Sequence, residues 1–146
     1  MLPATAARVA QQTNPEVNSR IRRRTAESVR WHAHNRGAIP RRLAELDHEW
    51  DIERVLEANA STAVLLGLAA GATVDRRFFV VPGLVAAFLL QHALQGWCPP
   101  LPIFRRLGFR TQTEIEAERY ALKAVRGDFE TAAAGGKARA LSAVRS

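Results

Sequence analysis

The hydrophobic pattern of this chain is dominated by two long apolar stretches, residues 52–74 and 78–97. The first contains the uncharged run ASTAVLLGLAAGATV, and the second begins with the uncharged run FFVVPGLVAAFLLQHAL. Only Asp75-Arg76-Arg77 separates them, as in a tight polar turn. A membrane-spanning helix needs about 20 mostly apolar residues with about 1.5 Å of rise each. The pattern predicts a two-helix transmembrane hairpin, and the alternative is a buried hairpin in a soluble helical protein.

A helical segment is predicted over residues 25–50, before the hairpin. Thr25–Asn35 can form a short helix, and Pro40 opens another in its first turn. Three apolar residues of this second helix share one face: Leu43, Leu46 and Trp50. The helical face that carries the apolar residues changes at Asp51, which is a suitable N-cap residue. We therefore expect an interfacial or cytoplasmic helix to end there and the first spanning helix to begin.

The prolines at 99, 100 and 102 end the second apolar stretch, so the predicted hairpin domain covers residues 51–109. Another amphipathic helix is expected over residues 110–127, because Thr111 and Glu114 have capping-box spacing. Gly127 ends it, and three of its apolar residues share a face: Ile115, Leu122 and Val125.

The two ends of the chain, residues 1–24 and 128–146, show no apolar periodicity and are predicted to be disordered. The predicted fold class is thus all-α. It consists of a transmembrane hairpin with an interfacial or cytoplasmic helix on each side, and disordered termini.

Small residues recur every four positions along the first apolar stretch. Ala63, Gly67 and Gly71 would lie on one helical face, which Asn59 extends by one turn. Small residues let two membrane helices approach closely, and this packing stabilises them where lipid is as apolar as leucine. These four residues are the predicted packing face. Their partner is left open between the second helix and another copy of the chain in a homo-oligomer.

The charge balance predicts an anionic partner. The formal net charge is +7, carried by 19 Arg and two Lys. An Arg- and Ala-rich chain with almost no Lys suggests a GC-rich bacterial genome. Because no nucleic-acid-binding motif is present, we expect the lipid bilayer with its anionic headgroups as the partner. Arg41, Arg42, Arg105 and Arg106 are the predicted headgroup-facing residues, with Trp50 and Trp97 as interfacial anchors. The cluster Arg20, Arg22, Arg23 and Arg24 has three readings: lipid binding, nucleic-acid binding or a solvated charge run.

Few residues offer chemistry. Cys98 follows the second apolar stretch, where the negative end of the helix dipole opposes thiolate formation, so it is read as a structural thiol. The presence of the polar His92 in an apolar stretch is explained by snorkelling or by a hydrogen bond to Asn59. The pair His32 and His34 is a weak metal pattern, read as surface residues. No acid–base pair, phosphate loop or metal set is visible, so no enzyme activity, cofactor, metal or small-molecule substrate is predicted.

A short element after the second apolar stretch carries a family resemblance. Its Gly-x-Cys-Pro sequence, followed by Leu-Gly, consists of Gly96, Cys98, Pro99, Leu107 and Gly108. This resembles the end of the second helix in the YgaP-like inner-membrane transmembrane domain family, and Glu53-Arg54 resembles the acidic-Arg pair that opens the first. The resemblance covers about residues 51–109 and implies a hairpin in the bacterial inner membrane. The family has no assigned biochemical function. A rhodanese domain, present in its best-known architecture, is not seen here, so sulfurtransferase activity is not implied.

Three functions are compatible with these observations. The first is a non-enzymatic membrane module that packs or oligomerises in the bilayer and anchors or scaffolds a partner. The second is a thiol or sulfur relay through Cys98, working with a separate soluble sulfurtransferase or redox protein. The third is a basic arm that binds anionic lipid or nucleic acid. The missing catalytic constellation favours the first.

The excess of arginine outside the apolar stretches predicts that both termini lie in the cytoplasm. Reporter enzymes that work only in the periplasm should be inactive when fused to either terminus. They should be active when inserted at Asp75–Arg77. A periplasmic signal from one terminus alone would mean that the chain spans the membrane once.

Overall fold

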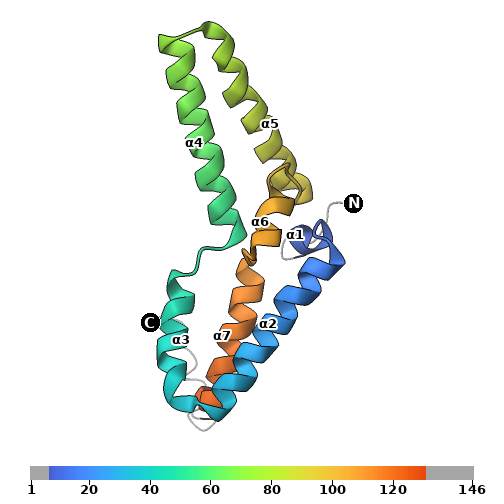
Figure 1. Ribbon diagram of the computed structural model, residues 1–146, viewed down its shortest axis with the longest axis vertical. Helices are drawn as coiled ribbons and strands as arrows, with labels where there is room; N and C mark the ends of the chain where they lie inside the picture. Colours follow the sequence, from blue (N-terminus) through green and yellow to red (C-terminus); the bar gives the residue numbers. More distant parts are fainter. Residues whose placement is uncertain (1–6, 131–146) are drawn as a thin grey trace. The chain divides into compact units, whose positions relative to one another are not determined.

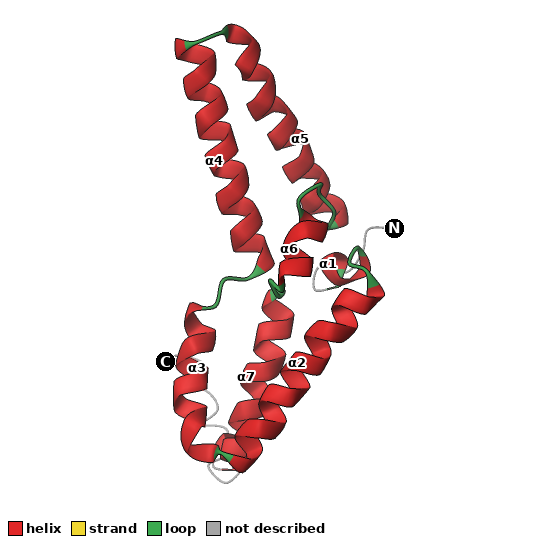
Figure 2. Cartoon of the chain, viewed as in Figure 1, coloured by secondary structure: helices red, strands yellow, loops and turns green. Residues whose placement is uncertain are grey.

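In the computed structural model, which describes residues 7–130, the chain is helical and contains no strand over that range (Figure 2). The helices form two compact units, and each is described by itself. Unit 1 contains residues 7–22 and 50–113. Unit 2 contains residues 23–49 and 114–130. Helices α2 (Pro15–His34) and α7 (Gln112–Arg126) each begin in unit 1 and continue into unit 2.

The two apolar stretches form the two long helices of unit 1. These are α4 (Ile52–Thr73) and α5 (Val80–Gln95), joined by the 3-10 turn η2 (Arg76–Phe79), and they lie side by side in Figure 1. The Asp51 carboxylate accepts a hydrogen bond from the Arg54 backbone N–H, which confirms the predicted N-cap. Gly96 ends α5 with φ +76°, a backbone conformation that L side chains rarely adopt.

Near the turn, α4 and α5 touch through the glycines of the predicted packing face. A Cβ on Gly67 would lie 2.7 Å from Pro82 Cδ, and a Cβ on Gly71 would lie within 3 Å of the Phe79 ring. Both glycines are buried against the second half of the same hairpin. The structure therefore assigns Gly67 and Gly71 to packing within the hairpin.

The N-terminal arm is helical where the structure describes it, which corrects the prediction of disorder. Helix α1 covers Arg8–Gln11, and α2 begins at Pro15, ten residues before the predicted start of a short helix at Thr25. Asn14 caps α2 by accepting a hydrogen bond from the Glu16 N–H at 2.8 Å. Two apolar residues one turn apart, Val17 and Ile21, are buried. Two apolar residues are too few to show helical periodicity in the sequence. The helix is stabilised mainly by its tertiary packing. Residues 1–6 lie outside the described range.

A short helix, α6 (Leu101–Leu107), begins within the group of prolines that was expected only to end α5. Pro100 and Pro102 lie at its first turn, where a missing N–H breaks no helical hydrogen bond. Gly108 ends α6 with φ +104°. The Arg110 carbonyl beyond it accepts a hydrogen bond from the Ile52 N–H at 2.8 Å, which ties this segment to the start of α4.

The core of unit 1 lies at the end of the hairpin away from the turn. Its buried members come from α1, α4, α6 and the segment after α5: Val9, Ile52, Leu56, Cys98 and Leu101. Arg105 of α6 is only 1% exposed. Its guanidinium donates to Thr13 Oγ1, Asn18 Oδ1 and the Phe109 carbonyl at 2.9–3.1 Å. One buried side chain thus connects the N-terminal helices to α6.

Unit 2 packs α3 (Ile39–His48) and α7 against the later part of α2. Its buried apolar residues are Ile39, Leu43, Leu46, Ile115 and Leu122. Within this core Glu118 is fully buried; Arg42 binds both of its carboxylate oxygens, and the Ser28 hydroxyl donates to one at 2.6 Å. The hydrogen bond to Glu118 is the main cause that raises the pKa of Arg42. Helix α7 ends at Arg126 before Gly127, as predicted. Residues 128–130 of the predicted disordered tail are helical, and residues 131–146 lie outside the described range.

The glycine contacts predict that a branched side chain at position 67 separates α4 from α5. Gly67→Ile should destabilise the hairpin by about 1–3 kcal/mol, the usual cost of overpacking. Gly83→Ile is the matched control, because a Cβ at Gly83 meets no atom within 4 Å. Both variants are compared by far-UV circular dichroism during titration with a denaturing detergent. Equal midpoints for the two variants would contradict the packing assignment.

Candidate functional site

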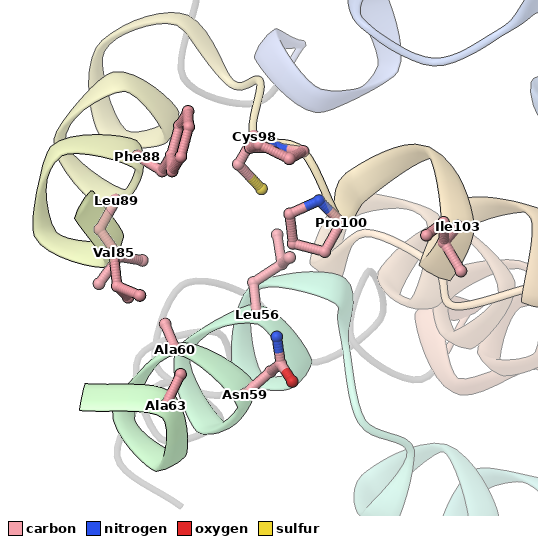
Figure 3. A pocket seen from close by; sticks show the side chains of 11 residues that line it. Leu56, Asn59, Ala60, Ala63, Val85, Phe88, Leu89, Cys98, Pro100 and Ile103 are labelled. Carbon is pink, nitrogen blue, oxygen red and sulfur yellow. The ribbon is translucent and has the colours of Figure 1, made fainter. Parts of the chain in front are cut away.

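A cavity of about 430 Å³ lies between α4, α5 and the start of α6, within unit 1. Its lining is almost entirely apolar, and Asn59 and Cys98 are the residues that bring polar side-chain atoms (Figure 3). The Sγ atom of Cys98 points into this space, between the α5 wall that carries Phe88 and the α4 wall that carries Leu56. A cavity of this size and lining is in the range that holds small apolar ligands.

A network of charged residues lies beside Cys98. His92 Nε2 lies 2.7 Å from Glu53 Oε2, and Arg8 Nη2 lies 3.1 Å from Glu53 Oε1. Arg8 also donates to the Ala93 carbonyl at 3.3 Å. A carboxylate only accepts hydrogen bonds, so Nε2 carries the proton that His92 shares with Glu53.

The His92 ring is 5% exposed, and its Nδ1 makes no hydrogen bond to any of the described residues. The side chain of Cys98, which is 4% exposed, lies beside this ring. A buried polar atom without a partner is costly, so native structures leave few of them. A thiol, an imidazole and a carboxylate thus lie next to one another where α5 ends.

Helix α1 reaches this network because Gly96 has no side chain. A Cβ at Gly96 would lie 2.6 Å from the Arg8 carbonyl carbon, so only glycine allows the approach. The same glycine allows the chain to turn sharply from α5 toward Cys98. The predicted Gly-x-Cys-Pro element therefore has a local structural role at the exit of α5.

The other predicted site residues lie in different parts of the structure. Of the small-residue face, Asn59 and Ala63 line the cavity, whereas Gly67 lies against the start of α5 and Gly71 against Phe79 of η2. Trp50 is exposed, with Arg54 Cζ 5.3 Å from its ring centroid, and Trp97 is half-buried against the core. The tryptophans therefore differ in accessibility, and their membrane depth stays a prediction.

Two of the four predicted headgroup-facing arginines are corrected. Arg105 is buried and bound to protein acceptors, as described above. Arg42 pairs with Glu118 and Glu45, so its guanidinium binds carboxylates instead of facing outward. Arg41 and Arg106 are exposed. Sequence alone treats every arginine near a membrane helix as a surface charge, whereas five N–H donors also suit a buried arginine that finds several acceptors.

Sequence reasoning missed the two partners of His92. It suggested Asn59 as a hydrogen-bond partner, but the structure places Glu53 there. Glu53 opens α4 and was noticed only as part of a family-like pair, and Arg8 lay in a segment expected to be disordered. The sequence did contain a signal for the Glu53–His92 pair. The acidic residue lies in the first turn of one predicted helix, and the histidine lies in the last turn of its antiparallel neighbour.

No group of three or more His, Cys, Asp or Glu side chains that could hold a metal ion occurs among residues 7–130. His32 is buried and its Nδ1 lies 2.8 Å from the Ser28 carbonyl, while His34 is exposed. Comparisons with known protein families, with curated proteins and with solved structures gave no match for this chain.

The network predicts that Glu53 holds both α1 and His92 in place. Glu53→Ala should lower the free energy of unfolding by about 1.5–3 kcal/mol, because hydrogen bonds to a charged group are lost and a buried histidine is left unpaired. Glu57→Ala is the control, since Glu57 lies one turn further along α4 and is exposed. Thermal unfolding in mild detergent and limited trypsin cleavage in residues 8–22 provide the readouts. Unchanged cleavage and stability in Glu53→Ala would show that the network does not stabilise the fold.

Proposed function

We propose that this chain is a small non-enzymatic membrane protein whose α4–α5 hairpin inserts into the bilayer and anchors the rest of the chain. The exposure of apolar side chains along both helices carries this proposal. Leu65 and Leu66 on α4 are 67% and 66% exposed, and Leu90 on α5 is 62% exposed. Hydrocarbon is the environment that makes such surfaces favourable.

The fraction of buried residues separates this proposal from a soluble helical core. Both helical stretches are long and apolar enough to span a membrane, and only 22% and 6% of their apolar windows are buried. The core helix of a soluble protein would be mostly buried. Exposed apolar residues extend along the whole length of α5: Val80, Leu84, Phe88, Leu90 and Leu94.

The proposed location is the bacterial inner membrane, with two spans and both termini in the cytoplasm. The arginine distribution supports this orientation. The exposed Arg22, Arg23 and Arg24 on α2 supply positive charge for anionic headgroups or nucleic acid. The Gly-x-Cys-Pro element supports membership in the YgaP-like family, which this proposal includes. Oligomerisation would need a face other than Gly67 and Gly71, since these pack within the hairpin.

The second candidate, a thiol or sulfur relay through Cys98, is favoured by the neighbouring His92 and Glu53. A protein partner in such a relay must bring its own sulfur to Cys98 Sγ. Because Cys98 is 4% exposed, this access requires the segment after α5 to open. The anchoring module therefore remains the better-supported function.

Membrane insertion is tested by washing cell membranes with alkaline carbonate and, separately, with urea. The protein should stay in the membrane pellet. Leu66→Arg together with Leu90→Arg should shift it away from the pellet, because a charge near the centre of a span costs about 2.5–3.5 kcal/mol during insertion. Glu57→Arg, near the start of α4, is the matched charge control. Release of the unaltered protein by carbonate would overturn the proposal.

A further inference from the structure

The cavity described above extends from the hairpin to α6. Ala60 and Ala63 of α4 and Val85 of α5 line it between the two long helices, whereas Ile103 belongs to α6 (Figure 3). An apolar cavity left empty forfeits dispersion contacts along its lining. An occupant that matches this lining is therefore apolar, and it reaches α6 without leaving the cavity.

Helix α6 has a buried side and an exposed side. Leu101 and Arg105 are buried, whereas Ile103 and Leu107, one turn apart, are 61% and 69% exposed. Arg106 is also exposed and lies one turn beyond Ile103 along the helix. Apolar side chains beside a cation are typical of a helix at the boundary between hydrocarbon and headgroups. Because Ile103 also lines the cavity, the apolar part of this exposed side is continuous with it.

A second cation lies beside Arg106. Arg20 of α2 places its guanidinium there, because Nη2 donates to the Arg106 carbonyl at 3.1 Å. Neither arginine pairs with a carboxylate among residues 7–130. Glu53, the acidic residue in the first turn of α4, is already bound to Arg8 and His92. Guanidinium groups bind phosphate through pairs of parallel hydrogen bonds, so this positive charge suits a phosphate.

We propose that unit 1 binds one anionic phospholipid, with an acyl chain in the cavity between α4 and α5 and the phosphate at Arg106 and Arg20. This inference rests on the proposed insertion of the hairpin, which brings lipid to the cavity. It adds a specific lipid site where the anchoring function needs only a bilayer. The proposed orientation puts α6 on the cytoplasmic side, where basic residues meet anionic headgroups. Burial of the acyl chain holds the lipid, and the charge of the headgroup selects it.

The test measures, by native mass spectrometry, the phospholipid that the full chain binds during titration in a mild detergent. Dipalmitoyl phosphatidylglycerol should bind as one molecule per chain. Dipalmitoyl phosphatidylcholine has the same chains and no net charge. It should bind about tenfold more weakly, because a hydrogen bond to a charged group is worth about 1.5–3 kcal/mol. Equal binding of the two lipids would overturn the proposal.

Two further ligands separate the acyl chain from the phosphate. A short-chain phosphatidylglycerol and inorganic phosphate carry the anion without a chain that fills the cavity, and neither should be retained. Retention of either one as firmly as the dipalmitoyl lipid would show a free-phosphate site and overturn the proposal.

The headgroup contact is tested by a matched pair of arginine substitutions. Arg106→Gln should weaken the binding of dipalmitoyl phosphatidylglycerol about tenfold, because charge-assisted hydrogen bonds to the phosphate are lost. Arg76→Gln removes an exposed arginine at the other end of the hairpin and should leave this binding unchanged. Equal affinities of the two variants would contradict the assignment of the phosphate to Arg106.

The role of the cavity is tested by a second pair. Ala63→Phe fills the space between the helices, whereas Ala86→Phe adds the same side chain to an exposed position of α5. We expect the bound lipid to be lost in Ala63→Phe and kept in Ala86→Phe, with both variants equal in helix content. Equal retention by the two would refute the cavity as the place of the acyl chain.

Failure of this inference differs from failure of membrane insertion. A protein that resists carbonate extraction but binds both dipalmitoyl lipids equally refutes the lipid site and leaves the anchor intact. A protein that carbonate releases refutes the anchor.

Discussion

The pairing of Glu53 with Arg8 and His92 is the interaction on which unit 1 depends. These three residues come from α1, α4 and α5, and they meet at the end of the hairpin away from the turn. A covalent turn holds one end of a hairpin, but the other end needs tertiary contacts. A carboxylate that binds two donors fixes how the helices are oriented at this end, because hydrogen bonds are directional and apolar packing is not.

The two ends of the hairpin therefore differ in packing, and the difference creates the cavity. Near the turn, Gly67 and Gly71 lie against Val81, Pro82 and Phe79 without a gap. At the other end, the segment after α5 lies between the helices and leaves an apolar space with Cys98 at its wall. The exposed apolar faces and most of the cavity lining thus belong to the same two helices.

In each unit, a buried charged side chain with several partners also holds distant segments together. Arg105 binds three acceptors in unit 1, and Glu118 binds Arg42 and Ser28 in unit 2. Removing water from a charge is expensive, so such a residue is tolerated only where its partners are already fixed. These contacts join segments far apart in the sequence, and both lie outside the α4–α5 hairpin.

The sequence by itself determined α4, α5 and the end of α7, because their signals are local. Apolar runs gave α4 and α5, Asp51 gave a cap, and Gly127 ended α7. Tertiary structure decided which polar residues are buried and what they bind, because those partners are up to about ninety residues apart. The sequence predicts Arg105 and Arg42 to be surface charges, whereas the fold places hydrogen-bond acceptors beside them. The site around Cys98 exists only because folding brings Glu53 and His92, 39 residues apart, to one end of the hairpin.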